Sequence, residues 1–203
     1  MINKKIVIIG YSGHSYGCIE VAINQKYLIV GYHDILEKVS NPYKLNYLGH
    51  EDRVDSNHKV FIAIGDNFIR KKIYEILSSN KISLDTTLIH SNSTISKSSL
   101  IEEQIFIGAG VIINPQVKIG VGCIVNTGAI IEHDCSISKF SHIAPGAVLA
   151  GNVSIGSGCM IGANAVIRQG VKIGDNVTVG AGAVVLKDIN SNTTFVGNPA
   201  KKI

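Results

Sequence analysis

An unbroken six-residue repeat runs from Ile89 to Val185 and limits the folds that this 203-residue chain can adopt. Every sixth position is aliphatic, and nearly all of these residues are β-branched. A period of six fits neither a helix nor the simple alternation of a strand, but it is typical of a β-solenoid. Three sides make a coil of 18 residues, so residues 18 apart should stack at strand spacing, roughly 4.8 Å. The large positions are Ile89, Ile95, Ile101, Ile107, Ile113, Ile119, Val125, Ile131, Ile137, Ile143, Leu149, Ile155, Ile161, Ile167, Ile173, Val179 and Val185.

Four residues after each large position lies a second register of small residues or Val, apart from Ile105. Cys123, Cys135 and Cys159 occupy this register, and Cys18 falls in a predicted helix. A thiol that faces the axis of a solenoid acts as a small apolar filler. Because the chain has no C-x-x-C pair, we expect four structural cysteines and no metal site.

The N-terminal segment predicts the opening of a nucleotide-binding βαβ unit. Residues 4–9 form a β-branched run that ends at Gly10, a glycine-containing loop follows to Gly17, and residues 18–25 have helical spacing. Glycines let the main chain turn sharply, and a helix N-terminus offers free amides to an anion. The spacing G-x-x-G-x-x-x-G lacks the dinucleotide fingerprint G-x-G-x-x-G, so a purely structural turn is the alternative.

Residues 27–32 and 58–64 predict a second and a third strand. Asp34 follows the second strand, where a carboxylate commonly binds a ribose or a base, although a solvated turn acid would look the same. Residues 35–57 have no strong period, so we expect a loop with at most a short helix or strand.

A second helix is expected over residues 68–77, with Asp66 or Asn67 as its N-cap. Apolar residues recur on one face of this helix, and three cations should lie on its solvated face. The apolar residues are Ile69, Ile73, Ile76 and Leu77, and the cations are Arg70, Lys71 and Lys72. Residues 83–89 should lead into the solenoid as an extended segment. We therefore expect a small α/β domain with three or four parallel strands over residues 1–84, and a solenoid with a C-terminal tail over residues 85–203.

The charge and hydropathy of the chain narrow the possible partners. The net charge is +4, and Lys and Arg are scattered along the sequence. This pattern argues against a nucleic-acid partner and is compatible with anionic small molecules such as nucleotides. No apolar run is long enough to span a membrane, and Met1 to Lys5 enter a strand without a leader pattern. We expect a cytoplasmic protein.

The segment Ile131-Glu132-His133-Asp134 places an imidazole between two carboxylates at a predicted turn. A carboxylate on one ring nitrogen fixes the tautomer, leaves the other nitrogen as a proton acceptor and increases its basicity. A histidine in a solenoid turn can also be purely structural, but the flanking acids favour a general base at His133. Either acid could orient the ring.

The stacking of successive coils places Gly151 beside His133, which leaves room next to the imidazole. His142 lies half a coil further on and is a second candidate. A column of small residues on the neighbouring face would complete a shallow groove that leads away from His133 and accommodates an extended pantetheine arm. This column consists of Pro145, Ala163 and Ala181.

The repeat resembles that of the hexapeptide-repeat acyltransferases, which form left-handed parallel β-helices. The chain, over residues 4–203, resembles the bacterial nucleotide-sugar N-acetyltransferases of the PglD type and the related NeuD-type sialic acid O-acetyltransferases. The matching segments are residues 10–14 (GYSGH), 63–67 (AIGDN), 69–74 (IRKKIY), 131–134 (IEHD), 140–142 (FSH), 150–153 (AGNV) and 195–201 (FVGNPAK). The resemblance implies an α/β, Rossmann-like nucleotide-binding domain followed by a left-handed parallel β-helix.

The resemblance also implies roles for individual residues. His133 would be the general base, with its basicity increased by Asp134, and His142 would contact acetyl-CoA in a cleft between adjacent solenoids of a trimer. Gly151, Ala163 and Ala181 would lie along the cofactor, and Ser12, Gly13, His14, Asp34 and Gly65 would hold the nucleotide sugar. The family pattern has two acids after the second strand, whereas Ile35 follows Asp34 here, so the choice between uracil and thymine stays open.

We therefore expect an acetyl-CoA-dependent enzyme that N-acetylates a UDP- or dTDP-linked 4-amino-deoxy sugar for surface glycan synthesis, without a metal. O-acetylation of a sialic acid or another sugar hydroxyl is the alternative within the same class, since the same base serves both. A non-catalytic trimer that senses nucleotides is the alternative from another class, and the acids beside His133 argue against it. A metal-dependent solenoid hydratase is disfavoured, because only His133 and His142 lie in suitable turns.

Overall fold

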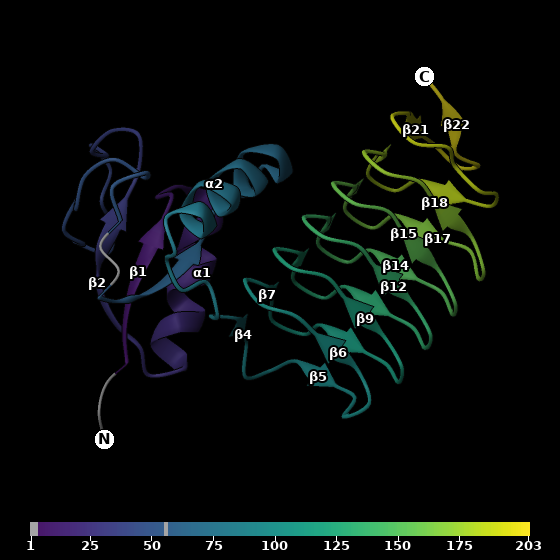
Figure 1. Ribbon diagram of the computed structural model, residues 1–203. Helices are drawn as coiled ribbons and strands as arrows, with labels where there is room; N and C mark the ends of the chain where they lie inside the picture. The colour runs from purple at the N-terminus through teal and green to yellow at the C-terminus, as the bar shows by residue number, and fades with distance from the viewer. Residues whose placement is uncertain (1–3, 55–56) are drawn as a thin grey trace.

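The computed structural model describes residues 4–54 and 57–203, so the start of the chain at Met1 and two residues of the expected loop lie outside the described residues. Figure 1 shows an α/β part at the N-terminal end and a stack of coils that extends from it to the C-terminus. The predicted fold class, an α/β domain followed by a parallel β-solenoid, is confirmed. Of the described helices, none is long and apolar enough to cross a lipid bilayer.

The α/β part is a parallel sheet of order β2-β1-β3 with two helices. Its elements are β1 (Lys5–Ile9), α1 (Gly13–Asn24), β2 (Leu28–His33), β3 (Lys59–Ile62) and α2 (Asn67–Ser79). Side chains of β1 alternate between two hydrophobic clusters, because successive residues of a strand point to opposite faces. Ile6 and Ile8 pack in the cluster that contains α1, whereas Val7 and Ile9 pack in the cluster that contains α2. The sheet is therefore buried on both faces.

The helix boundaries differ in part from the expected ones. α1 begins at Gly13 rather than at Cys18, because Ser12 ends the loop as the N-cap and the helix includes the glycine segment. Asp66 is the N-cap of α2, as predicted, and accepts a hydrogen bond from Ile69 N over 2.9 Å.

The solvated face predicted for α2 is wrong at Arg70. Its side chain is only 2% exposed, whereas Lys71 and Lys72 are exposed as expected. Ile69 is also misplaced by the prediction, since it is exposed rather than buried. The physical reason is that this side of α2 meets main-chain carbonyl groups of the solenoid, and a guanidinium can satisfy those acceptors whereas an aliphatic side chain cannot.

The solenoid consists of three parallel sheets, here named B, C and D, and each coil adds one strand to each sheet along most of its length. Sheet B contains β4 (Leu88–Ile89), β7 (Phe106–Ile107), β10 (Ile124–Val125), β13 (His142–Ile143), β16 (Met160–Ile161), β19 (Thr178–Val179), β21 (Thr194–Val196) and, antiparallel, β22 (Lys201–Lys202). Sheet C contains β5 (Thr94–Ile95), β8 (Ile112–Ile113), β11 (Ile130–Ile131), β14 (Val148–Leu149), β17 (Val166–Ile167) and β20 (Val184–Val185). Sheet D contains β6 (Leu100–Ile101), β9 (Lys118–Ile119), β12 (Ser136–Ile137), β15 (Ser154–Ile155) and β18 (Lys172–Ile173).

The large and small registers of the repeat form the core of the solenoid, as predicted. Cys123, Cys135 and Cys159 are fully buried in it as free thiols, and Cys18 is buried in α1. Within the described chain, no group of three or more His, Cys, Asp or Glu residues is arranged to hold a metal ion. The coils pack closely at their turns, since a Cβ on Gly162 would lie only 2.5 Å from Ala181 N.

The two parts of the chain share a hydrophobic cluster. Leu88, Phe106 and Ile124, which lie on sheet B, pack with Cys18 and Ile19 of α1. The N-terminal end of sheet B is therefore covered by the α/β part. The expected boundary between residues 84 and 85 falls in the link between α2 and β4. This shared cluster fixes the loop after β1 near the coils that carry the candidate histidines.

Candidate active site

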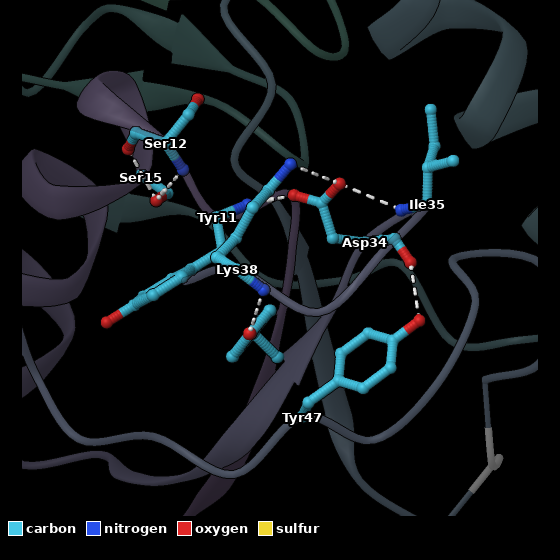
Figure 2. Close-up of polar contacts among 8 residues, drawn as sticks. Tyr11, Ser12, Ser15, Asp34, Ile35, Lys38 and Tyr47 are labelled. Atoms are coloured by element: carbon cyan, nitrogen blue, oxygen red, sulfur yellow. Dashed lines mark hydrogen bonds and ion pairs between the residues drawn. The ribbon is translucent and has the colours of Figure 1, made fainter. Parts of the chain in front are cut away.

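The loop after β1 leads directly into α1 and carries Ser12, Gly13 and His14. Ser12 N donates to Ser15 Oγ over 2.8 Å, and Ser15 Oγ donates to Ser12 O over 2.7 Å, which closes the turn into the helix (Figure 2). Gly10 has φ +87°, a conformation that favours glycine. A Cβ on Gly13 would meet no other part of the chain within 4 Å. The positive end of the α1 dipole is therefore open to an anion such as a phosphate.

Asp34 fixes this loop from the end of β2, as Figure 2 shows. Its Oδ2 accepts a hydrogen bond from Tyr11 N over 2.8 Å, and its Oδ1 accepts one from Ile35 N over 2.8 Å. Lys38 Nζ pairs with the same Oδ1 over 2.9 Å. The buried carboxylate thus holds the glycine loop in place, and its contact with a nucleotide stays a prediction.

The expected loop after β2 is tied to the α/β part by tyrosine hydroxyl groups. Tyr11 Oη donates to Asn41 Oδ1 over 2.7 Å, and Tyr47 Oη donates to Asp34 O over 3.2 Å. Among its described residues no helix or named strand forms, and one isolated bridge joins Tyr32 to Tyr47. The loop therefore forms a fixed wall beside Asp34.

His142 meets the α/β part at His14 and Gly65. The ring centroids of His14 and His142 are 6.3 Å apart. His142 hydrogen-bonds to the main chain of Gly65, and its Nε2 lies 3.2 Å from Asn126 Nδ2. The structure thus brings a predicted cofactor residue together with two predicted substrate residues.

Both of these imidazoles are neutral at physiological pH. Burial, followed by the nearby charge of Arg70, lowers the pKa of His142 to about 4, and the Gly65 hydrogen bond opposes this only in part. Burial, followed by the proximity of His142, lowers the pKa of His14 to about 3. Such groups can donate and accept hydrogen bonds, but they are weak proton acceptors at neutral pH. The general base is therefore better sought elsewhere.

His133 lies in the turn between β11 and β12, with its side chain 55% exposed. Its Nδ1 lies 2.8 Å from Asp134 Oδ2, so Asp134 orients the ring and Nε2 keeps its lone pair when Nδ1 carries the proton. A Cβ on Gly151 would lie 2.7 Å from His133 Nε2, so the missing side chain makes room for the imidazole. The predicted stacking of Gly151 against His133 is confirmed.

The two walls of the predicted groove lie on opposite edges of sheet C. His133 and Gly151 follow strands of sheet C, whereas Ala163 and Ala181 precede such strands, in turns that leave sheet B. A single chain therefore does not form the predicted groove, because the width of sheet C separates its walls. The period of the coil gives the stacking along the axis correctly, but it does not give distances around the coil.

A cleft that the sequence did not predict lies between the start of α2 and sheet B, with a volume of about 510 Å³. Gly65 lies at this cleft, together with the exposed Phe68. Met160 and Thr178 also line it, and they occupy the position of His142 in the next two coils, on the outer face of sheet B. The 18-residue spacing from His142 to Met160 and Thr178 was the signal in the sequence that could have predicted these two lining residues.

Three family profiles match the chain. The profile described as PglD N-terminal domain matches residues 5–77. In the solenoid, the profile described as bacterial transferase hexapeptide (six repeats) matches residues 134–169, and the profile described as hexapeptide repeat of succinyl-transferase matches residues 152–187.

Solved structures that resemble this chain cover its whole length. The acetyltransferase domain of PglB from Neisseria gonorrhoeae FA1090, in complex with acetyl coenzyme A, is 34% identical, with a TM-score of 0.91 over 99% of this chain and 100% of that chain. PerB from Caulobacter crescentus, in complex with CoA and GDP-perosamine, is 32% identical, with a TM-score of 0.92 over 100% of this chain and 98% of that chain. WeeI from Acinetobacter baumannii AYE, at 24% identity and a TM-score of 0.89 over 99% of this chain and 100% of that chain, shares the fold.

The lowered pKa of His142 predicts a pH dependence of stability. Its pKa in the folded chain is about 4, below its ordinary 6.5, so the unfolded chain binds more protons between these values. The stabilisation is complete above pH 6.5 and is lost as the pH falls toward 4, by up to about 3 kcal/mol. Urea unfolding at several pH values should show a shallower loss for His142→Gln, and a still shallower one for His14→Gln/His142→Gln. Equal slopes for wild type and both variants would contradict the neutral imidazoles.

Proposed function

The chain belongs to the PglD-like family of hexapeptide-repeat sugar acetyltransferases. We propose that it transfers the acetyl group of acetyl-CoA to the amino group of a UDP- or dTDP-linked 4-amino-deoxy sugar, for surface glycan synthesis. The observation that carries this proposal is the His133–Asp134 pair, with the space that Gly151 leaves beside it. The similarity to PerB, whose structure contains CoA and GDP-perosamine, supports a nucleotide sugar as the acceptor. We place the enzyme in the cytoplasm, where buried free thiols such as its own stay reduced.

In the proposed reaction His133 moves the proton. An amino group attacks a thioester only when its lone pair is free, so His133 Nε2 accepts a proton from the amine as its nitrogen bonds to the carbonyl carbon. Asp134 stabilises the imidazolium that forms. As the C–S bond breaks, the imidazolium returns the proton to the leaving thiolate, which gives an amide and the CoA thiol. In this proposal a main-chain amide stabilises the charge that develops on the thioester oxygen.

His14 and His142 have a different role in this proposal. Their lowered pKa values keep them neutral, so they act as hydrogen-bonding groups that orient the sugar and the thioester rather than as bases. The position of His142 between Gly65 and Asn126 suits this role, since it fixes the ring from both parts of the chain.

The nucleotide lies at the N-terminus of α1 in this proposal. Gly13 and His14 present main-chain amides to the pyrophosphate, Ser12 offers its hydroxyl, since its own N–H is bound to Ser15, and Gly65 leaves space on the facing loop. Both oxygens of Asp34 already accept hydrogen bonds, and the exposed Ile35 follows it instead of a second acid. The base is therefore held mainly by shape and apolar contact.

We also propose that the enzyme is a homotrimer joined through sheet C. Apart from Thr94 in the first strand, the outward positions of this sheet are apolar, and Ile112 and Val166 are each 38% exposed. Sheet D instead presents Lys118 and Lys172 to solvent, and the α/β part covers the start of sheet B. The remaining outward positions of sheet C are Ile130, Val148 and Val184. When sheet C of one copy meets its partners, the edge of sheet C that carries His133 in one chain lies beside the edge that carries Ala163 in the next chain. The two chains together then form the predicted groove for acetyl-CoA.

A charge on sheet C should therefore break the trimer. Val148→Lys places an ammonium in the proposed contact, where burial of an unpaired charge is strongly unfavourable. We expect sedimentation equilibrium to give three times the chain mass for wild type and a much lower mass for Val148→Lys. Ser154→Lys on sheet D is the matched control and should remain a trimer. An unchanged mass for Val148→Lys would refute the proposed interface.

Replacement of the base tests the reaction itself. Thiol release from acetyl-CoA is measured with UDP-, dTDP- and GDP-linked 4-amino sugars, free sialic acid and CMP-sialic acid. We expect turnover on an amino sugar that falls roughly 10²–10⁴-fold in His133→Ala, and less in Asp134→Asn, because the proton acceptor and its orienting group are lost. His90→Ala, at a turn of the first coil, should leave the rate unchanged.

The same panel separates the alternatives. Turnover on sialic acids alone would move the enzyme to O-acetylation, and binding of nucleotides without any acetyl-CoA binding would leave a sensing trimer as the better account. A His133→Ala enzyme with full activity would show that another group removes the proton.

A further inference from the structure

Arg70 is the most deeply buried charged side chain in the part of the chain that the structure describes. It lies in the first turn of α2, and its guanidinium reaches into the junction between the loop after β3 and the solenoid. Its contacts are Nε to Gly122 O (2.7 Å), Nη1 to Ile64 O (2.9 Å) and Gly65 O (3.0 Å), and Nη2 to Asn67 Oδ1 (2.7 Å) and Phe140 O (3.2 Å). Five donors thus meet five acceptors.

These acceptors are all uncharged, four being main-chain carbonyl groups and one a side-chain amide. Burial lowers the pKa of Arg70 to about 10, against smaller opposing effects of Cys123 and Asp66. An apolar side chain would fill this space without removing a cation from water. What an apolar side chain cannot supply is a rigid, planar set of donors in fixed directions.

On the solenoid side, the carbonyl acceptors lie in equivalent turns of three successive coils. They belong to Gly122, Phe140 and Gly158, each of which lies one coil after the one before. Arg70 binds the first two, and Asn67 Nδ2 binds the third over 3.3 Å together with Cys159 O over 2.9 Å. Because Asn67 Oδ1 also accepts from Arg70, the two side chains form one link across three coils.

On the side of the α/β part, the link formed by Arg70 and Asn67 ends at the loop after β3, which faces the candidate site. Arg70 Nη1 binds the carbonyl groups of Ile64 and Gly65. Gly65 also hydrogen-bonds to His142, and a Cβ on Gly65 would lie 3.6 Å from His14 Cβ. A displacement of Arg70 would therefore move the loop against both histidines.

We propose that Arg70 and Asn67 are positioning residues that fix the nucleotide-sugar-binding part on the solenoid and so set where the sugar amine stands relative to the acetyl thioester. This inference rests on the proposed function. In this proposal Arg70 acts through the main chain of Gly65, and Asn67 acts through Arg70 and the carbonyl groups of Gly158 and Cys159. A misplacement of about 1 Å far from the chemistry can lower a rate on the order of 10²-fold. Binding of acetyl-CoA to the solenoid does not depend on the link.

The test compares Arg70→Met, which keeps an unbranched stem and removes all five donors, with Lys72→Met, which removes an exposed cation from the same helix. kcat and KM are measured with the nucleotide-linked amino sugar and with the same amino sugar without its nucleotide, which reaches the solenoid without the α/β part. We expect kcat for the nucleotide-linked acceptor to fall about 10²-fold in Arg70→Met. The slow transfer to the free sugar and the Kd of acetyl-CoA should stay unchanged, and Lys72→Met should match wild type throughout.

Two further variants keep the inference testable if Arg70→Met fails to fold. Arg70→Lys restores the charge and up to three donors and should lie between wild type and Arg70→Met, while Asn67→Ala should lower kcat in the same selective way. Equal losses on both acceptors, in step with thermal stability, would show a merely structural role and overturn the inference, as would full activity of Arg70→Met and Asn67→Ala. A wild-type protein that acetylates neither acceptor would remove the proposed function and this inference with it.

Discussion

Main-chain hydrogen bonds between successive coils fix every column of side chains in the solenoid. The ladder runs through both candidate histidines, since His142 N donates to Cys159 O and Asn152 N donates to His133 O, each over 2.8 Å. A strand paired in this way cannot shift by one residue without turning its inward side chains outward. The place of His133 in its turn, and the space beside it at Gly151, therefore follow from the register of the coils. Asp134 then needs only to set the orientation of a ring whose position the main chain has already determined.

The junction of the two parts is held by a different interaction, a buried guanidinium that binds neutral carbonyl groups. Arg70 links the loop at Gly65 to two coils of the solenoid, and its charge adds to the effect of burial in lowering the pKa of His142. The group that joins the parts thus also keeps the neighbouring imidazole neutral. This separates the two histidines by chemistry: His133 is exposed and paired with an acid, whereas His142 is buried near a cation. The lowered pKa makes His142 a poor proton acceptor at neutral pH, and in the proposed reaction that role falls to His133.

The features that repeat along the sequence were predictable, and those that depend on contacts between distant segments were not. The period of six gave the three sheets, the buried cysteines and the stacking of Gly151 on His133, because each follows from local register. Helical spacing gave no reason to bury Arg70, since its acceptors are main-chain carbonyl groups of the solenoid, which leave no trace in side-chain patterns. The separation of the Ala163 column from His133 was missed for a related reason, because the width of a sheet cannot be read from spacing along the axis.

Because the α/β part covers the start of sheet B, the proposed trimer brings its nucleotide-linked amine to the His133 side of an adjacent solenoid rather than to the His133 of the same chain. The most direct measurement is a crystal structure with CoA and a nucleotide-linked 4-amino sugar bound. We expect the pyrophosphate at the Ser12–His14 loop and the amino nitrogen roughly 3 Å from Nε2 of the partner's His133, within reach for proton transfer. An amino nitrogen placed against His142 and far from every His133, or a nucleotide bound away from the α1 N-terminus, would contradict this expectation.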